Sequence, residues 1–255
     1  MFKESKISKE AEQKDIYEKA GEYIEKLLPE LKEISEELKE KNFPVDEVCR
    51  INTEAFKDIF GERVIMADQK IVEKTERKFL EKENKNIGEL LETVKTIAFN
   101  KLWFKERLIS LRTSKFDDYF NGVDEVIFDT ETHQPLAAVD TTTNINEKIE
   151  KMIDKIKKGS QVKYGFYIKD NIRKGSLNDL PTFIISLKPE ELLEFTQKII
   201  NHFEGEQLEQ FDLKTREHIL ESLKLQSEKF QEIADYKMKH SYEIAGQIFD
   251  DLLKS

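Results

Sequence analysis

Two aspartates near the middle of the chain, Asp124 and Asp140, have the residue type and spacing for metal chemistry. Each adjoins a short apolar run, at residues 123–128 and 136–139, and the segment between the runs contains the turn formers Asp and Pro. Because the two aspartates are equidistant from Thr132, a regular hairpin would place them opposite each other on neighbouring strands. Facing carboxylates repel unless a cation or a proton lies between them, and their oxygens suit Mg²⁺. The spacing predicts a metal site, against the simpler interpretation that both residues only cap and turn the chain.

The elements that must position this pair change character along the chain. Apolar residues at spacings of three and four predict a helix over about residues 9–41, which Pro29 should end or kink near Leu28. The further segments predicted as helices are 46–60, 65–79, 86–107, 145–158 and 189–203. The segments predicted as strands are 108–113, 123–128, 136–139, 162–168 and 182–187. This alternation in the middle of the chain indicates an α/β layer structure.

The two ends of the chain differ from this middle region. Residues 212–255 carry an apolar stripe with an imperfect heptad fit, so we expect helices that pack against the N-terminal helices rather than form a coiled coil. The pattern divides the chain into a helical N-terminal region (1–85), an α/β core (86–203) and a C-terminal helical extension (204–255).

Composition limits the possible function classes. Charged residues make up 37% of the 255 residues, above the ~25% of typical soluble domains, which favours long solvated helices around a modest core. The single cysteine, Cys49, excludes an internal disulfide framework and indicates a reducing compartment, where we expect it to be a small packed residue. No apolar run approaches the ~18 residues of a membrane helix, and no apolar segment follows the N-terminus, so we expect a cytoplasmic protein without a membrane partner.

Several other chemistries lack their sequence signals. The four histidines are dispersed without the spacing of a zinc site. The chain has no P-loop, no dinucleotide-binding glycine pattern and no nucleophile elbow. These absences argue against a zinc enzyme, a nucleotide-dependent enzyme of those classes and a serine hydrolase.

The net charge of −10 argues against a surface that binds nucleic acid all over, but one local stretch is basic. Between residues 148 and 174 nine cationic residues stand against three acidic ones, which suits a phosphate backbone. The predicted nucleic-acid contacts are Arg112, Lys151, Lys155 and Lys158. Arg112 could instead pair with Asp117 or Asp118. The aromatic residues of the strand at 162–168 could stack on bases, but alternating aromatics of this kind are more often core residues.

The middle region resembles the PD-(D/E)XK nuclease superfamily. The resemblance rests on a helix that carries a Glu, a strand, an acid at the start of a second strand, an acid at the end of a third, a helix and a buried strand. The segment Asn121-Gly122-Val123-Asp124 matches the first acid, and residues 138–142 lie where the superfamily has its acid-x-Lys signature. The resemblance covers about residues 86–203 and implies a small mixed β-sheet of the PD-(D/E)XK type. The extensive N- and C-terminal helices that we expect to flank this sheet lie outside the resemblance. Residues 112–124 also resemble uncharacterised bacterial proteins with an R-T-S-x-[FY]-D-D-x-x-N-G-V-D segment, from which no function is carried over.

This resemblance implies a divalent-metal-dependent endonuclease that hydrolyses phosphodiester bonds in DNA. Asp124 and Asp140 would hold Mg²⁺ or Mn²⁺, and a Glu of the preceding helix would add a ligand or orient the attacking water. Glu92 is favoured for this role over Glu89 and Glu106. Asp118, which precedes a glycine-containing loop, could be a further ligand or only a turn former.

The sequence departs from the superfamily pattern at Thr142, which occupies the position of the catalytic lysine. Lys148 or Lys151 on the following helix, or Lys163 on the next strand, could supply the missing ammonium, because a hydroxyl stabilises phosphate charge poorly. Alternatively, the fold is catalytically inactive and serves as a nucleic-acid or protein binding module. The apolar helix faces would then mediate homo-oligomer formation or bind a protein partner. Whether the chain is an enzyme therefore stays open at this stage.

Overall fold

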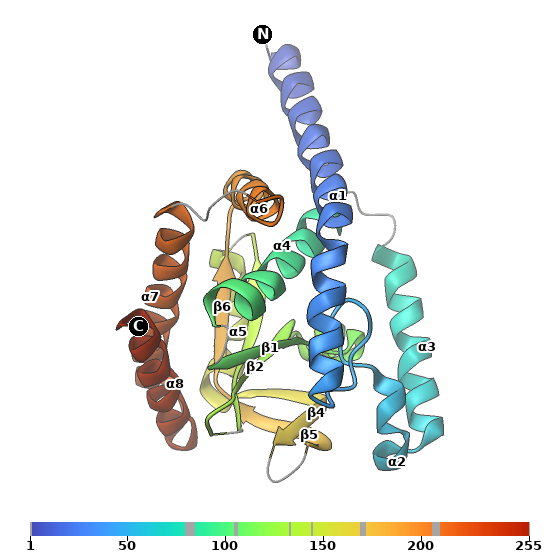
Figure 1. The fold of residues 1–255 in the computed structure, drawn as a ribbon, viewed down its shortest axis with the longest axis vertical. Coiled ribbons are helices and arrows are strands. Elements are labelled where there is room, and N and C mark those ends of the chain that lie inside the picture. The colour runs from blue at the N-terminus through green and yellow to red at the C-terminus, as the bar shows by residue number, and fades with distance from the viewer. Residues whose placement is uncertain are drawn as a thin grey trace.

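The computed structural model describes residues 2–79, 85–104, 107–132, 134–143, 145–168, 172–205 and 210–254. Within these ranges the description excludes the side chains of residues 2–13, 79, 85, 145–147, 151, 168 and 210–213. The protein is a mixed α/β structure in which helices surround a small mixed sheet (Figure 1).

A four-stranded sheet with the order β1-β2-β3-β6 forms the centre of the fold. Its strands are β1 (Leu108–Arg112), β2 (Glu125–Asp129), β3 (Gln134–Thr142) and β6 (Thr182–Ser186). The first three form an antiparallel meander, whereas β6 runs parallel to β3. All five residues of β1 and of β2 are buried, as expected for strands that are covered on both faces.

The register of β2 and β3 places the two aspartates side by side. Val126 pairs with Ala138 and Glu125 with Val139, and the backbone N–H of Asp124 donates to the carbonyl of Val139 at 3.0 Å. One step further along this register, Asp124 lies opposite Asp140. The hairpin predicted from their spacing is therefore present in the structure.

Two groups of helices cover the sheet, one on each side in Figure 1. The first contains α1 (Phe2–Glu40), α4 (Lys85–Ile97) and α6 (Pro189–Phe203), which pack on one another. The second contains α5 (Ile145–Lys158), α7 (Gln210–Ile233) and α8 (Tyr236–Lys254), which pack on β3, β5 and β6. The prediction that the C-terminal helices pack against the N-terminal ones is wrong. Tyr242 on α8 explains the difference, because its buried hydroxyl accepts a hydrogen bond from the Thr182 N–H of β6 and donates to the Ile156 carbonyl of α5.

The long helix α1 continues through Pro29, so the helix end expected near Leu28 is not found. Leu27, Leu31 and Ile34 are buried at helical spacing on either side of the proline. Burial of a Leu or Ile side chain stabilises by about 1.5–3 kcal/mol, so this stripe outweighs the hydrogen bond that proline removes.

Several smaller elements also differ from the sequence prediction. Residues 46–60 form no long helix, only the 3-10 turn Thr53–Phe56 and the short α2 (Lys57–Phe60) before α3 (Glu62–Phe79). The helix α4 changes to π-helical turns over Ala98–Trp103. The strand β4 (Ser160–Ile168) pairs with an unpredicted β5 (Ile172–Leu180) in a separate two-stranded sheet.

The apolar core accounts for residues whose role the sequence left open. Cys49 is buried and unpaired, and its thiol donates to the Leu31 carbonyl, which confirms a packing role. Tyr164 and Phe166 are buried in β4, as core residues should be, while Tyr167 is partly exposed. Along the described residues, no helix combines the length and the apolarity that crossing a bilayer requires.

Candidate functional site

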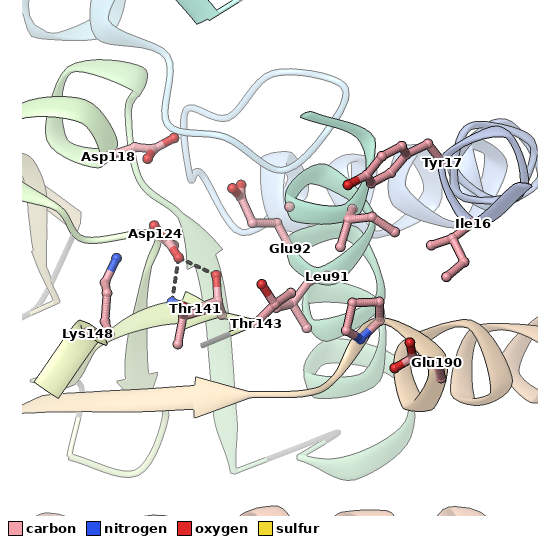
Figure 2. Close-up of a pocket in the computed structure, with 14 residues that line it drawn as sticks. Ile16, Tyr17, Leu91, Glu92, Asp118, Asp124, Thr141, Thr143, Lys148 and Glu190 are labelled. Carbon is pink, nitrogen blue, oxygen red and sulfur yellow. Dashed lines mark hydrogen bonds between the residues drawn. The ribbon is translucent and has the colours of Figure 1, made fainter. Parts of the chain in front are cut away.

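A hollow of about 740 Å³ lies where β3 ends, between α4, α5 and the N-terminal part of α6. Its lining includes the carboxylates of Glu92, Asp118 and Asp124 and the ammonium of Lys148 (Figure 2). These side chains come from four elements: α4, the π-helical turn Asp117–Asn121, the start of β2, and α5. Residues far apart in the sequence thus meet at one edge of the sheet.

Asp124 is held in one orientation by the end of β3. The backbone N–H of Thr141 donates to its Oδ2 at 2.6 Å, and the hydroxyl of Thr141 donates to the same oxygen. A carboxylate fixed in this way is oriented before any ligand arrives.

Asp140 lies deeper, with 2% of its surface exposed, and is flanked by two lysines of α5. Lys148 Nζ lies 2.7 Å from Asp140 Oδ1, and Lys155 Nζ donates to the Gly122 carbonyl at 2.9 Å. Among the described residues, no donor other than Lys148 reaches the Asp140 oxygens. Burial and the nearby Asp124 raise the pKa of Asp140 to about 6. The pKa of Lys155 is lowered by burial, whereas that of Lys148 is raised because Asp140 outweighs its burial.

Gly122 is required by this arrangement for two reasons. Its φ of 56° lies in the left-handed region that favours glycine. A Cβ at this position would also lie 2.5 Å from Lys155 Nζ and 3.9 Å from Asp140 Oδ2. The Asn-Gly-Val-Asp segment therefore brings the chain close to the second acid as well as carrying the first.

Two buried arginines hold Glu92 beside the hollow. Arg112 Nη2 lies 2.6 Å from Glu92 Oε2 and 2.8 Å from Glu89 Oε1, and Arg50 Nη2 lies 3.0 Å from the same Glu92 oxygen. Burial acts to raise the pKa of Glu92, but Arg112 and Arg50 outweigh it and lower the pKa to about 2. Glu92 is consequently ionised at every physiological pH.

Asp118 has the opposite environment. Its Oδ2 lies 3.4 Å from Arg50 Nη1, but burial, followed by the charges of Glu92 and Asp124, raises its pKa to about 8. A carboxyl group that is neutral below pH 8 beside the ionised Glu92 is typical of a site that is built to receive positive charge.

The neighbouring Asp117 fixes the loop that carries Asp118. Its side chain accepts hydrogen bonds from the backbone N–H groups of Lys163 and Tyr164, from the Ser114 hydroxyl and from the Asn121 amide. Sequence reasoning considered Asp117 only as a partner for Arg112. The Ser-x-x-Asp spacing was the available signal for this local network.

Of the predicted site residues, Glu92, Asp124 and Lys148 line the hollow together, and Lys148 joins Asp140 to them through an ion pair. Asp118, which the sequence left open as a ligand or a turn former, also lines the hollow. Lys163 does not join this group, because its ammonium binds Asp68 of α3 and lies over the rings of Phe60, Phe116 and Tyr164. The predicted lysine on β4 is therefore directed to a structural contact instead.

The predicted nucleic-acid contacts have different fates. Arg112 is fully buried against Glu89 and Glu92, so the expected phosphate contact is wrong, and so is its alternative pairing with Asp117 or Asp118. Lys155 lies beside the hollow, and Lys158 is exposed on α5 near Asp154. The side chain of Lys151 and all of Glu106 lie outside the described residues. Sequence reasoning missed Arg50, because no local pattern links it to Glu92, which is 42 residues away.

Whether the residues fit a divalent cation depends on their donor atoms. Within the described ranges, no set of three or more His, Cys, Asp or Glu side chains is arranged to hold a metal ion. Asp124 and Asp140 nevertheless supply carboxylate oxygens from adjoining strands, which is the donor type that Mg²⁺ and Mn²⁺ prefer. Among the described residues, Lys148 is the one cation within ion-pair distance of the buried Asp140 oxygens, and this sparsely satisfied carboxylate is the observation that favours a bound cation. The donor set fits an ion that keeps several waters.

Comparisons of the chain with protein-family models, with curated proteins and with solved structures gave no match. The chemistry of the hollow is therefore argued from its own residues.

The raised pKa of Asp118 leads to a prediction about stability. Because the folded state holds this proton more tightly than the unfolded state, folding should be strengthened as the pH falls from about 8 towards 4. Above pH 8 the buried charge opposes folding, so Asp118→Asn should raise the Tm of the metal-free protein at pH 8.5 by at least ~2 °C. At pH 5.5 the difference in Tm should be smaller, and it should disappear near pH 4. Calorimetry in EDTA measures this, with the exposed Asp154→Asn as control, and a Tm that falls at pH 8.5 would contradict the assignment.

Proposed function

We propose that the protein is a divalent-metal-dependent endonuclease of the PD-(D/E)XK type that acts on DNA. The observation that carries this proposal is the meeting of Asp124, Asp140 and Lys148 at the end of β3. Two carboxylates from adjoining strands and one ammonium are the groups that the resemblance requires. The ammonium comes from α5 instead of position 142, where the chain has Thr.

The order of the elements supports the same proposal. The helix α4 carries Glu92, the meander β1-β2-β3 carries both aspartates, and α5 leads to β6, which lies parallel to β3. This succession agrees with the one on which the resemblance was based. The β4-β5 hairpin lies between α5 and β6 as an insertion that leaves the central sheet continuous.

The residues have separate tasks in hydrolysis. Asp124 and Asp140 would hold the cation, which when bound polarises the phosphate and lowers the pKa of a water molecule. Glu92, kept ionised by its two arginines, accepts a hydrogen bond from the attacking water and orients it. Lys148 supplies positive charge against the charge that develops on the phosphate. Water attacks phosphorus and releases a proton to the solvent, the bond between phosphorus and the leaving oxygen breaks, and the leaving oxygen takes up a proton from the solvent.

The second candidate is a catalytically inactive fold that binds nucleic acid or a protein partner. The ion pair between Lys148 and Asp140 favours it, because the ammonium already neutralises a carboxylate that a metal ion would need. This candidate predicts DNA affinity that falls steeply with salt and no cleavage.

Incubation with supercoiled plasmid and with single-stranded DNA tests the proposal directly. We expect cleavage with Mg²⁺ or Mn²⁺, none with EDTA, and none by Asp124→Ala, since that variant loses an oriented cation ligand. Circular dichroism and the Tm of the variant serve to check folding. Salt-sensitive binding without cleavage would replace the enzyme by the second candidate, and cleavage that Asp124→Ala retains would reveal a contaminating nuclease.

A further inference from the structure

The hollow beside the aspartates has two chemically different ends (Figure 2). Asp118, Asp124 and Lys148 gather at one end, whereas Tyr17 and Ile16 of α1 lie at the other, with Glu92 and Leu91 of α4 between them. The side chain of Tyr17 reaches from α1 towards the acidic end. Ile87 and Pro189 add apolar surface to the hollow. A site that holds only a cation and a water molecule does not require this apolar surface.

The α4 face that borders the hollow is open. Ile87, Gly88, Leu91 and Glu92 follow one another along this face at spacings of one and three residues. A Cβ placed on Gly88 would meet nothing within 4 Å, so packing does not explain the glycine. Glycine inside a helix costs about 0.5–1 kcal/mol relative to alanine. Because Gly88 has no side chain, the helix backbone is accessible from the hollow between the apolar side chains of Ile87 and Leu91.

Size and charge limit what the hollow can hold. Its volume of about 740 Å³ lies within the range of pockets that bind small organic ligands. Of the described residues in its lining, Lys148 is the one cation, against Glu92, Asp118, Asp124 and Glu190. These carboxylates disfavour a continuous run of phosphates. The hollow accommodates a single phosphate at its cation end, next to Lys148, with the attached base directed to the apolar end.

We infer that the Tyr17 end of the hollow binds one unpaired nucleobase next to the phosphate that is cut, so that the substrate is single-stranded DNA or an unpaired strand end. A base has two flat faces that stack on an aromatic ring, which suits Tyr17, while Ile87 and Leu91 exclude water. A base held in a duplex cannot enter. This inference rests on the proposed function and adds the substrate class to it.

Binding of fluorescent single-stranded oligonucleotides tests the inference, with Ca²⁺ as the hard cation that occupies oxygen ligands. A series of oligonucleotides carries one abasic position each. For the wild-type protein we expect one abasic position to weaken binding about tenfold, because stacking of one base is lost. Tyr17→Leu, which keeps an apolar side chain, should bind all members of the series equally weakly. Tyr17→Phe should behave like wild type, and so should Tyr236→Ala, a 94% exposed tyrosine on α8.

The outcomes separate this inference from the proposed endonuclease. Abasic sensitivity that disappears in Tyr17→Leu supports the base site, whether or not the protein cuts DNA. Metal-dependent cleavage without abasic sensitivity, or a fully paired duplex that binds as well as the single strand, overturns the base site and leaves the endonuclease standing. A protein that binds no single strand and cuts none overturns both.

Discussion

Asp140→Asn should lower the rate of Mg²⁺-dependent DNA cleavage by at least ~100-fold, because an amide supplies neither the charge nor the second anionic oxygen that a hard cation needs. Its effect on folding should be small or favourable. Burial and Asp124 raise the pKa of Asp140 to about 6, so the ionised carboxylate is costly at neutral pH in the absence of metal. Initial rates of plasmid nicking and the Tm of the metal-free protein measure the two effects, and titration calorimetry with Mn²⁺ measures the affinity for the metal.

The matched control for this variant is Asp154→Asn on α5, since that carboxylate is 85% exposed and lies 3.9 Å from the ammonium of Lys158. It makes the same chemical change without touching the hollow, so its rate should stay within about twofold of wild type. Asp140→Asn protein that keeps the wild-type rate and Mn²⁺ affinity would remove the metal site.

The parts of the fold that the sequence predicted are those set by local rules. The bounds of α5 follow from the glycine at 159, whose φ of 85° ends the helix, and those of α6 from Pro189 at the first turn. The pairing of Asp124 with Asp140 follows from the two-residue period of strands, which is kept up to the register shift between Ile127 and Phe128.

The parts that the prediction missed are set by tertiary contacts. The strand β5 contains few apolar residues, and it forms because β4 offers it an edge to pair with. Residues 46–60 have apolar residues at helical spacing, yet Ile51 donates its N–H to the carbonyl of Arg112, the last residue of β1. Arg112 donates its N–H to the carbonyl of Cys49, so this pairing keeps residues 49–51 out of a helix. No pattern within either segment carries that information.

The residues of the candidate site also fall into those that local sequence rules predict and those that tertiary contacts decide. Asp124, Asp140 and Glu92 were found because residue type, spacing and order along the chain identify them. Arg112 was misplaced, because a cation in a polar segment looks the same in sequence whether it contacts a phosphate or two buried carboxylates. Only the fold brings Glu89 and Glu92 to it, and burial then decides the partner.

A variant of Lys148 distinguishes the two candidate functions, because in the proposed endonuclease this lysine supplies the positive charge that Thr142 lacks. If its ammonium stabilises the charge that develops on the phosphate, Lys148→Met should lower the cleavage rate by about 100-fold while Mn²⁺ still binds. Lys148→Arg, which keeps the charge with a different shape, should recover part of that rate.

Lys237→Met on α8 is the control for Lys148→Met, because this lysine is 74% exposed, pairs with Asp179 and is not among the predicted nucleic-acid contacts. Single-turnover rates at saturating Mn²⁺ separate chemistry from metal binding. A different result would follow if Lys148 served only to neutralise Asp140. Removing it would then leave the carboxylate free for the cation, so Mn²⁺ affinity would rise and the cleavage rate would not fall. That outcome would mean that the 2.7 Å ion pair between Lys148 and Asp140 only stabilises the fold. Lys155, whose ammonium lies near Gly122 and the same carboxylate, would then be the next candidate for the catalytic cation.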